Sequence, residues 1–303
     1  MDAKDIGMQK EVGSVSVEAL KLAASMVKEG ARLADVAEAA EGLVLKKGFG
    51  IAFPINISVN EQAAHYTPSL EDDRVFKAGD IVKLDFGAEK EGLLGDVATT
   101  VVVGEDETRQ KLSEATKEAL EDAISVVRKG ASLSSIGKAI NSRIESMGFK
   151  PIKNLGGHGV ERHDLHHGIF IPNYDNGDDT KLEEGELIAI EPFATLQNGK
   201  GMVVEGDSQE IFQFVGAAQP RSEGARKLIA EIESKYPHEP FAARWLKSVI
   251  SDKFKLYASI RELQRLGAIE PYPVLVEAAG AIVSQHEAEM IVGTDSCEVV
   301  AIV

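Results

Sequence analysis

The sequence is poor in cysteine and lacks long apolar runs. Cys297 is the only cysteine among 303 residues, so no intrachain disulfide can form. No apolar stretch reaches the roughly 18 residues that a membrane-spanning helix requires. The chain does not begin with a basic segment followed by an apolar one, which is the pattern of a secretory signal. We therefore expect a folded protein of the reducing cytoplasm.

Positive charge is also scarce. Lys and Arg total 33 against 49 Asp and Glu, which gives a net charge of −16. A protein built to hold DNA needs a basic surface, so that class is excluded as the main function. The motifs of P-loop nucleotide binding, serine hydrolases and cysteine nucleophiles are absent as well. Part of the acidic excess has another explanation, because carboxylates that bind metal are neutralised in the folded protein.

The chain contains an internal repeat. Segment 27–33 (VKEGARL) recurs as 127–133 (VRKGASL). Apolar residues three to four positions apart follow each copy, which predicts an amphipathic helix that closes at Gly48 in one half and at Gly148 in the other. Two ordinary α/β units would share such an order of elements, but the identical residues in one register favour duplication. A duplicated fold is expected to place its site between the halves.

Each half also contains a turn, an apolar strand and a final carboxylate. Segment 78–85 (AGDIVKLD) matches 184–191 (EGELIAIE). Asp85 and Glu191 therefore end strands that should be buried, where an unpaired charge costs several kcal/mol. A structural ion pair would remove this cost, but it would not explain why both carboxylates occupy equivalent places in the repeat. A shared divalent cation explains both observations.

Further candidate ligands follow the same pattern. Asp96 lies on the strand after Asp85, and Glu287 lies where strand character resumes late in the chain. His158 falls in a glycine-rich turn (LGGHG), which lets backbone and metal approach closely. Together with Asp85 and Glu191 these side chains offer four carboxylates and one neutral imidazole, which balance the charge of two divalent cations. Such donors suit Co, Mn, Fe or Zn and disfavour a closed structural zinc site.

Segment 196–274 interrupts the repeat. Its apolar spacing and its prolines predict three helices, over 221–236, 241–250 and 254–266. Helices followed by a turn in this order are typical of a winged-helix-like unit. Basic residues outnumber acidic ones only slightly here, which favours a structural insertion over DNA binding. We expect a catalytic domain over 1–195 and 275–303, with the helical insertion over 196–274.

Several motifs carry a resemblance that covers almost the whole chain. They are segment 53–68 (FPINISVNEQAAHYTP), Asp85-Phe86-Gly87 with Asp96, Gly157-His158, Leu165-His166, Ile171-Pro172-Asn173 and segment 190–195 (IEPFAT). Together they resemble the signature of the methionine aminopeptidases of peptidase family M24. The insertion is similar to that of the archaeal type II enzymes. The resemblance implies an α/β (α+β) pita-bread fold of duplicated, pseudo-two-fold halves with antiparallel sheet, flanking helices and a winged-helix-like insertion.

The resemblance implies a metalloexopeptidase that removes the N-terminal methionine by two-metal-assisted hydrolysis of the first peptide bond, preferring a small second residue. In the family pattern, Asp85 holds one metal ion with both oxygens. Asp96 and Glu287 bridge the pair of ions. His158 and Glu191 hold the other ion, and Glu191 also carries the proton. The implied cofactors are thus two divalent ions for each chain.

The same resemblance implies residues that bind substrate. His166 would hydrogen-bond the substrate carbonyl oxygen as it becomes an oxyanion. His65 would contact the amide beyond the scissile bond. Phe53, Leu165 and Phe193 match the apolar wall that receives the methionine side chain. The expected partner is the N-terminal methionine of nascent polypeptides, with the ribosome left open as a further partner and with neither DNA nor membrane.

Three alternatives remain beside this interpretation. A binding protein that kept the fold but lost catalysis would lack metal ligands, whereas all five are present. A proline-specific aminopeptidase or creatinase relative would carry a different histidine-rich signature and a large N-terminal domain. In a protein that binds metal only for structure, His65 and His166 would have no functional role. His163 and His167 also lie near the motifs, and we interpret them as exposed or outer histidines rather than ligands.

Overall fold

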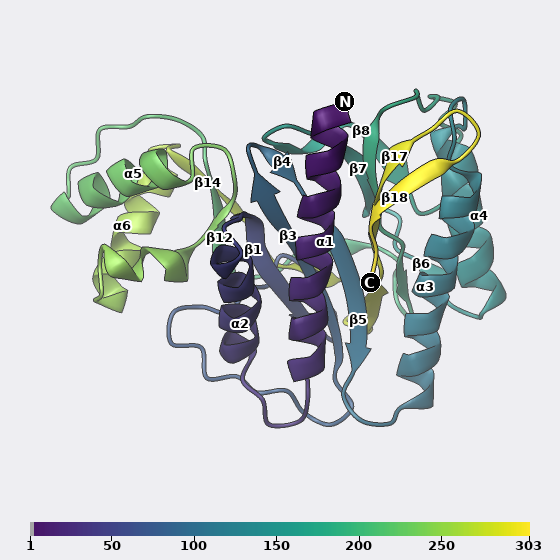
Figure 1. Ribbon diagram of the computed structural model, residues 1–303. Helices are drawn as coiled ribbons and strands as arrows, with labels where there is room; N and C mark the ends of the chain where they lie inside the picture. The colour runs from purple at the N-terminus through teal and green to yellow at the C-terminus, as the bar shows by residue number, and fades with distance from the viewer. Residues whose placement is uncertain (1–2) are drawn as a thin grey trace.

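The computed structural model describes residues 3–303, which form two similar halves and an insertion. The helices of the first half are α1 (Ala3–Met26) and α2 (Leu33–Lys46), and those of the second half are α3 (Glu107–Val126) and α4 (Leu133–Ser146). All four lie over one side of the strands (Figure 1). None of the helices within residues 3–303 combines the length and the apolar character that crossing a membrane needs.

The repeat seen in the sequence is also a structural repeat. Gly30 and Gly130 both have a φ of +79°, and both precede the second helix of their half. Gly48 and Gly148 have φ values of +82° and +84° after α2 and α4. A side chain disfavours this left-handed region, so the glycines fix equivalent helix ends. The predicted closure of both helices at these glycines is therefore confirmed.

The strands pair antiparallel throughout. The first-half sheet has β1 (Gly50–Val59), β3 (Ile81–Lys90), β4 (Leu93–Leu94) and β5 (Val97–Val102), in the order β1-β3-β4 with β5 also on β3. The second-half sheet has β7 (Gly156–Glu161), β8 (Asp164–Pro172), β9 (Leu187–Ile190), β17 (Ala288–Val292) and β18 (Cys297–Ala301), in the order β18-β17-β9-β7-β8. The expected mixed α/β class with antiparallel sheet is confirmed.

Two smaller sheets accompany these, and the second of them includes a strand of the insertion, β11. One holds β6 (Lys150–Pro151), β10 (Phe193–Thr195) and β16 (Val283–Gln285), and the other holds β2 (Gln62–Ala64), β11 (Val203–Glu205) and β15 (Leu275–Glu277). The main apolar cores lie between helices and sheets. Leu20 and Val36 pack with Leu84 in the first half, and Ile136 packs with Ile188 in the second. The face of the strands away from the helices is thereby left for the site.

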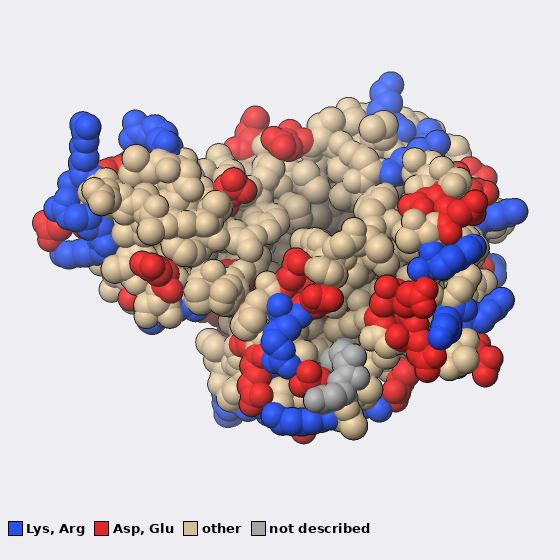
Figure 2. Space-filling view, turned by 90° about the horizontal axis from the view of Figure 1, so that it is seen from above, with Lys and Arg blue, Asp and Glu red and all other residues tan. Residues whose placement is uncertain are grey.

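The insertion has its own apolar cluster and projects to one side of the molecule (Figure 1). It contains α5 (Glu223–Lys235), the 3-10 helix η1 (Ala243–Ser248), α6 (Lys253–Arg265) and the strands β12 (Ile211–Phe214), β13 (Phe241–Ala242) and β14 (Ile269–Tyr272). The surface is hollowed between the insertion and the rest of the molecule (Figure 2). The division of the chain at residues 195 and 275 stays a prediction.

Of the three helices predicted in the insertion, two are present and one prediction is wrong. The helices expected over 221–236 and 254–266 are present as α5 and α6. The helix expected over 241–250 is instead a strand followed by a 3-10 helix. The physical reason lies in tertiary contacts: Phe241 pairs with Phe212 of β12, and the side chains that follow turn toward the first half.

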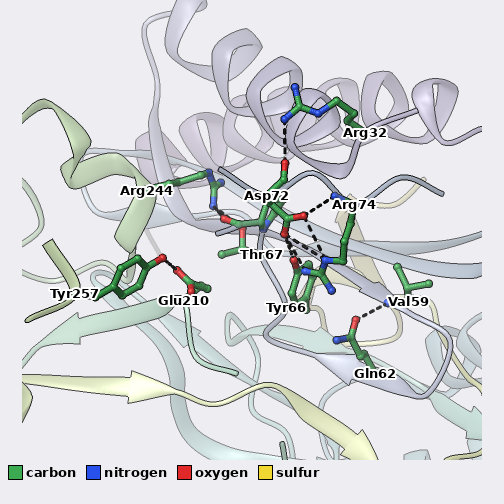
Figure 3. Close-up of polar contacts among 11 residues, drawn as sticks. Arg32, Val59, Gln62, Tyr66, Thr67, Asp72, Arg74, Glu210, Arg244 and Tyr257 are labelled. Carbon is green, nitrogen blue, oxygen red and sulfur yellow. Dashed lines mark hydrogen bonds and ion pairs between the residues drawn. The ribbon is translucent and has the colours of Figure 1, made fainter. Parts of the chain in front are cut away.

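These following side chains fasten the insertion to α2. Arg244 forms an ion pair with Glu41, and Trp245 Nε1 donates a hydrogen bond to Glu41 Oε2 at 2.9 Å. Arg244 Nη1 also donates to Thr67 Oγ1 at 2.7 Å (Figure 3). Burial raises the pKa of Glu41, and the charge of Arg244 opposes this rise. The contact is therefore a paired, hydrogen-bonded buried charge rather than an isolated one.

We expect Glu41→Leu to lower the free energy of unfolding by about 3–5 kcal/mol, because it leaves the Arg244 guanidinium buried without its partner. Urea denaturation of the variant measures this change. The matched control is Lys227→Met, which breaks an exposed ion pair with Glu223 and should cost at most about 1 kcal/mol. Equal effects of the two substitutions would contradict the structural role of the Glu41 contact.

Candidate metal-binding active site

The strands of both halves converge on one cavity. Asp85 lies on β3 opposite Ala98 of β5, and the backbone N–H of Glu287 donates to the carbonyl of Ala98 at 3.0 Å. His158 lies on β7 opposite Ala189 of β9. Asp96 precedes β5 and Glu191 follows β9. A backbone contact between the halves thus brings the acids of each half together.

The side chains of these residues are close enough to share ligands. Ligand atoms of Asp96, His158 and Glu287 all lie within 4.8 Å of one another. His158 Nε2 is 3.4 Å from Asp96 Oδ2 and 4.0 Å from Glu191 Oε1. Gln285 Nε2 donates to Asp85 Oδ2 and to Glu191 Oε2, each at 3.2 Å. All of the residues predicted as metal ligands therefore lie in one cluster.

The electrostatics of this cluster favour a bound cation. Burial, and then the charges of neighbouring carboxylates, raise the pKa of Asp85, Glu191 and Glu287 well above the usual range. Asp85 Oδ1 and Glu287 Oε2 are buried and have no hydrogen-bond partner within residues 3–303. Buried acceptors in proteins normally have a hydrogen-bond partner, so these two oxygens are suited to binding a cation instead. Hard carboxylate oxygens with one imidazole fit Co, Mn, Fe or Zn.

His65 is held at the cavity by a contact from the last residues of the insertion. Its Nδ1 lies 3.2 Å from the carbonyl oxygen of Pro273. Burial lowers its pKa to about 4, so the ring is neutral at neutral pH, and the carbonyl fixes the proton on Nδ1. The ring also meets Tyr272 edge to face, with centroids 5.4 Å apart. His65 therefore keeps Nε2 as a hydrogen-bond acceptor.

His166 lies against the predicted ligand His158. Their ring centroids are 4.5 Å apart with an interplanar angle of 65°. Burial, followed by the charges of His158 and His65, lowers the pKa of His166 to about 3. A neutral imidazole can donate from one nitrogen to an oxygen atom that gains charge. His166 therefore lies at the cavity wall beside the predicted ligand His158.

The cavity has a volume of about 400 Å³ and combines the acids with apolar walls. Phe53, Leu165 and Phe193 line it, as expected from the resemblance. Insertion residues that sequence reasoning missed also line it: Ile211, Pro240 and Tyr272. No pattern in the sequence marks these residues. Gln285 was missed as well, although alternation along a strand places it on the same face as Glu287.

The remaining histidines lie outside this cluster. His167 Nδ1 is 2.9 Å from Asp164 Oδ2, and about 45% of its side chain is exposed. His163 Nδ1 is 2.7 Å from Glu239 Oε1 at the edge of the insertion. Their interpretation as exposed or outer histidines agrees with these positions. His286 faces away from Glu287, with Nδ1 2.9 Å from Thr116 Oγ1 on α3.

Comparison with known proteins gives a consistent result. The model of metallopeptidase family M24 matches residues 7–216. A curated methionine aminopeptidase of Pyrococcus horikoshii is 43% identical over 97% of this chain and 99% of its own length. Another, of Archaeoglobus fulgidus, is also 43% identical over 93% of each chain.

Solved structures share the fold. A methionine aminopeptidase from Thermotoga maritima superposes with a TM-score of 0.73 at 25% identity, covering 100% of this chain and 98% of its own. A thermophilic Arx1 gives a TM-score of 0.85 at 17% identity, covering 99% and 91%. The second likeness shows the fold alone. These neighbours confirm the pita-bread architecture expected from the resemblance. The chain therefore belongs to metallopeptidase family M24 and, within it, to the methionine aminopeptidases.

Proposed function

We propose that the cavity binds the N-terminal methionine of polypeptide chains and that the protein hydrolyses the first peptide bond with two divalent metal ions. The observation that carries this proposal is the cluster of four carboxylates from both halves around one imidazole. None of the residues that line the cavity is Lys or Arg, so protein cations do not balance these acids. The names of the archaeal relatives support methionine as the residue removed.

The proposed division of labour among the ligands follows the family pattern. Asp85 would hold one ion through its carboxylate, whose Oδ1 is buried and has no hydrogen-bond partner within residues 3–303. Asp96 and Glu287 would be ligands shared by both ions. His158 and Glu191 would hold the second ion. When bound, the ions polarise the scissile carbonyl and lower the pKa of the attacking water.

The protein residues move the proton and steady the oxyanion. Glu191 takes the proton from the attacking water and delivers it to the leaving amine. His166 donates a hydrogen bond to the carbonyl oxygen as negative charge develops there. His65 accepts the N–H of the amide beyond the scissile bond at Nε2, because Nδ1 is committed to Pro273.

The substrate side chain is proposed to lie against the apolar wall. Phe53, Leu165 and Phe193 receive the methionine side chain. Pro240 and Tyr272 add a wall beside His65. Because this wall narrows the space beside His65, we propose that the residue after the methionine must have a small side chain.

The wider setting forms part of the same proposal. We propose nascent polypeptides as the natural partner and the cytoplasm as the location, with the ribosome as a further partner to test. The insertion over 196–274 would act as a separate structural unit that completes the cavity wall. The catalytic unit would comprise 1–195 and 275–303.

Peptide hydrolysis gives the direct test. The protein should release methionine from Met-Ala-Ser and leave Pro- and Leu-led peptides of the same length intact. A chelator should abolish the activity, and Co, Mn, Fe or Zn should restore it, because the ligands accept each of them. Equal cleavage of the Leu-led peptide, or full activity in excess chelator, would contradict the proposal.

The number of ions depends on the proposed bridging acids. We expect Glu287→Ala to bind fewer than two ions for each chain, measured by elemental analysis after dialysis, because one substitution removes a ligand from both positions. Glu161→Ala is the control, since this exposed acid lies on β7 outside the cluster. Retention of two ions by Glu287→Ala at unchanged affinity would argue strongly against the site.

A substitution of His166 should affect catalysis without affecting metal binding. We expect His166→Ala to lower kcat by about 10²–10³-fold, as for the loss of one oxyanion donor, while the metal content stays unchanged. His167→Ala, at the next position but exposed, should keep the wild-type kcat. Wild-type turnover in His166→Ala would remove the proposed role.

A further inference from the structure

A fifth buried acid lies next to the metal-binding cluster. Glu289 on β17 is 0% exposed and lies two residues after Glu287. Strand alternation therefore directs both side chains to the same face. Glu289 is close enough to Asp96 for the charge of Asp96 to help raise its pKa, after the larger effect of burial. None of the roles proposed above uses this carboxylate.

One hydrogen-bond donor to Glu289 comes from the N-terminal helix, and the backbone N–H of Asp96 also interacts with this carboxylate. Gln9 on α1 is also 0% exposed. Its Nε2 donates to Glu289 Oε2 at 2.9 Å and to the carbonyl oxygen of Leu94 at 2.6 Å. Leu94 lies two residues before Asp96. The Gln9 amide thus links the two segments that carry the proposed bridging acids, one from each half, beside the direct interaction of the Asp96 backbone with Glu289.

Helix α1 is firmly placed for this task. Ser16 Oγ accepts a hydrogen bond from the backbone N–H of Ala88 on β3 at 2.8 Å. A Cβ added to Gly13 would lie 2.2 Å from the carbonyl oxygen of Val300 on β18, so the helix touches that strand directly. The helix therefore contacts the sheets of both halves. A side chain on it can set the spacing between them.

We propose that Gln9 is a positioning residue that fixes the separation of Asp96 and Glu287 by holding Leu94 and Glu289 together. This inference rests on the proposed two-ion site. Bridging ligands held at the right separation bind ions more tightly, because ordering them on binding would cost free energy. Gln9 thereby makes the N-terminal helix part of the support of the metal-binding site.

Removal of the amide tests the proposal. In Gln9→Leu we expect the dissociation constant for Mn²⁺, measured by isothermal titration calorimetry, to rise by about 10–100-fold, the usual cost of losing an outer partner of a metal ligand. The electron paramagnetic resonance signal of the coupled Mn²⁺ pair should weaken in parallel, since it reports the relation of one ion to the other. A general loss of stability would not change that signal.

Two further variants keep the test decisive. Gln9→Asn retains the amide but is one methylene shorter, so it cannot reach both acceptors and should also weaken Mn²⁺ binding. Ser16→Ala is the matched control, because it removes another buried hydrogen bond between α1 and the sheet and leaves the bonds of Gln9 to Leu94 and Glu289 in place. It should lower the free energy of unfolding but keep the wild-type affinity and the coupled signal.

The outcomes distinguish this inference from the function on which it rests. Wild-type affinity and an unchanged coupled signal in Gln9→Leu and Gln9→Asn would overturn the role of Gln9 alone. An equal loss of affinity in Ser16→Ala would also overturn it, because helix packing in general would then be the cause. Wild-type protein that binds fewer than two ions would instead refute the two-ion site itself, and the inference with it.

Discussion

Mutual repulsion among carboxylates enclosed at one cavity is the constraint around which this molecule is organised. Asp85 and Asp96 come from one half, and Glu191 and Glu287 come from the other. Burial and the neighbouring charges raise the pKa of Asp85, Glu191 and Glu287, which favours the neutral form of these three groups. Divalent cations remove the repulsion and replace the lost solvation together. Binding of cations at the site should therefore also stabilise the fold that holds these carboxylates together.

The antiparallel architecture makes this convergence possible. The hydrogen bond between Glu287 and Ala98 joins the strands of the two halves directly beside the acids. Helices cover the opposite side, so the strands present their polar residues to the cavity. The insertion then closes one wall through Tyr272, and the Arg244–Glu41 ion pair fastens it to α2. Gln9 adds a link from α1 to the same place. Each of these contacts joins residues that are far apart in the chain.

Local patterns predicted much of this fold, and their failures have a common cause. Gly48 and Gly148 end their helices as expected because left-handed backbone is a local property. The helix expected over 241–250 gave way to a strand and a 3-10 helix because pairing with β12 and the contacts to Glu41 outweighed its helical pattern. Gln285 could have been found from strand alternation. Tyr272 and Pro240 could not, since no periodicity links them to the acids.

The sequence by itself determined the duplication, the set of acids and histidines and, through its motifs, the family. These are properties of residue type and spacing, which a chain carries before it folds. Only the tertiary structure decided which nitrogen of His65 holds the proton, which insertion residues line the cavity, and that Gln9 meets Glu289. Each of these depends on a contact between distant segments, and such contacts arise from packing rather than from any repeating pattern along the chain.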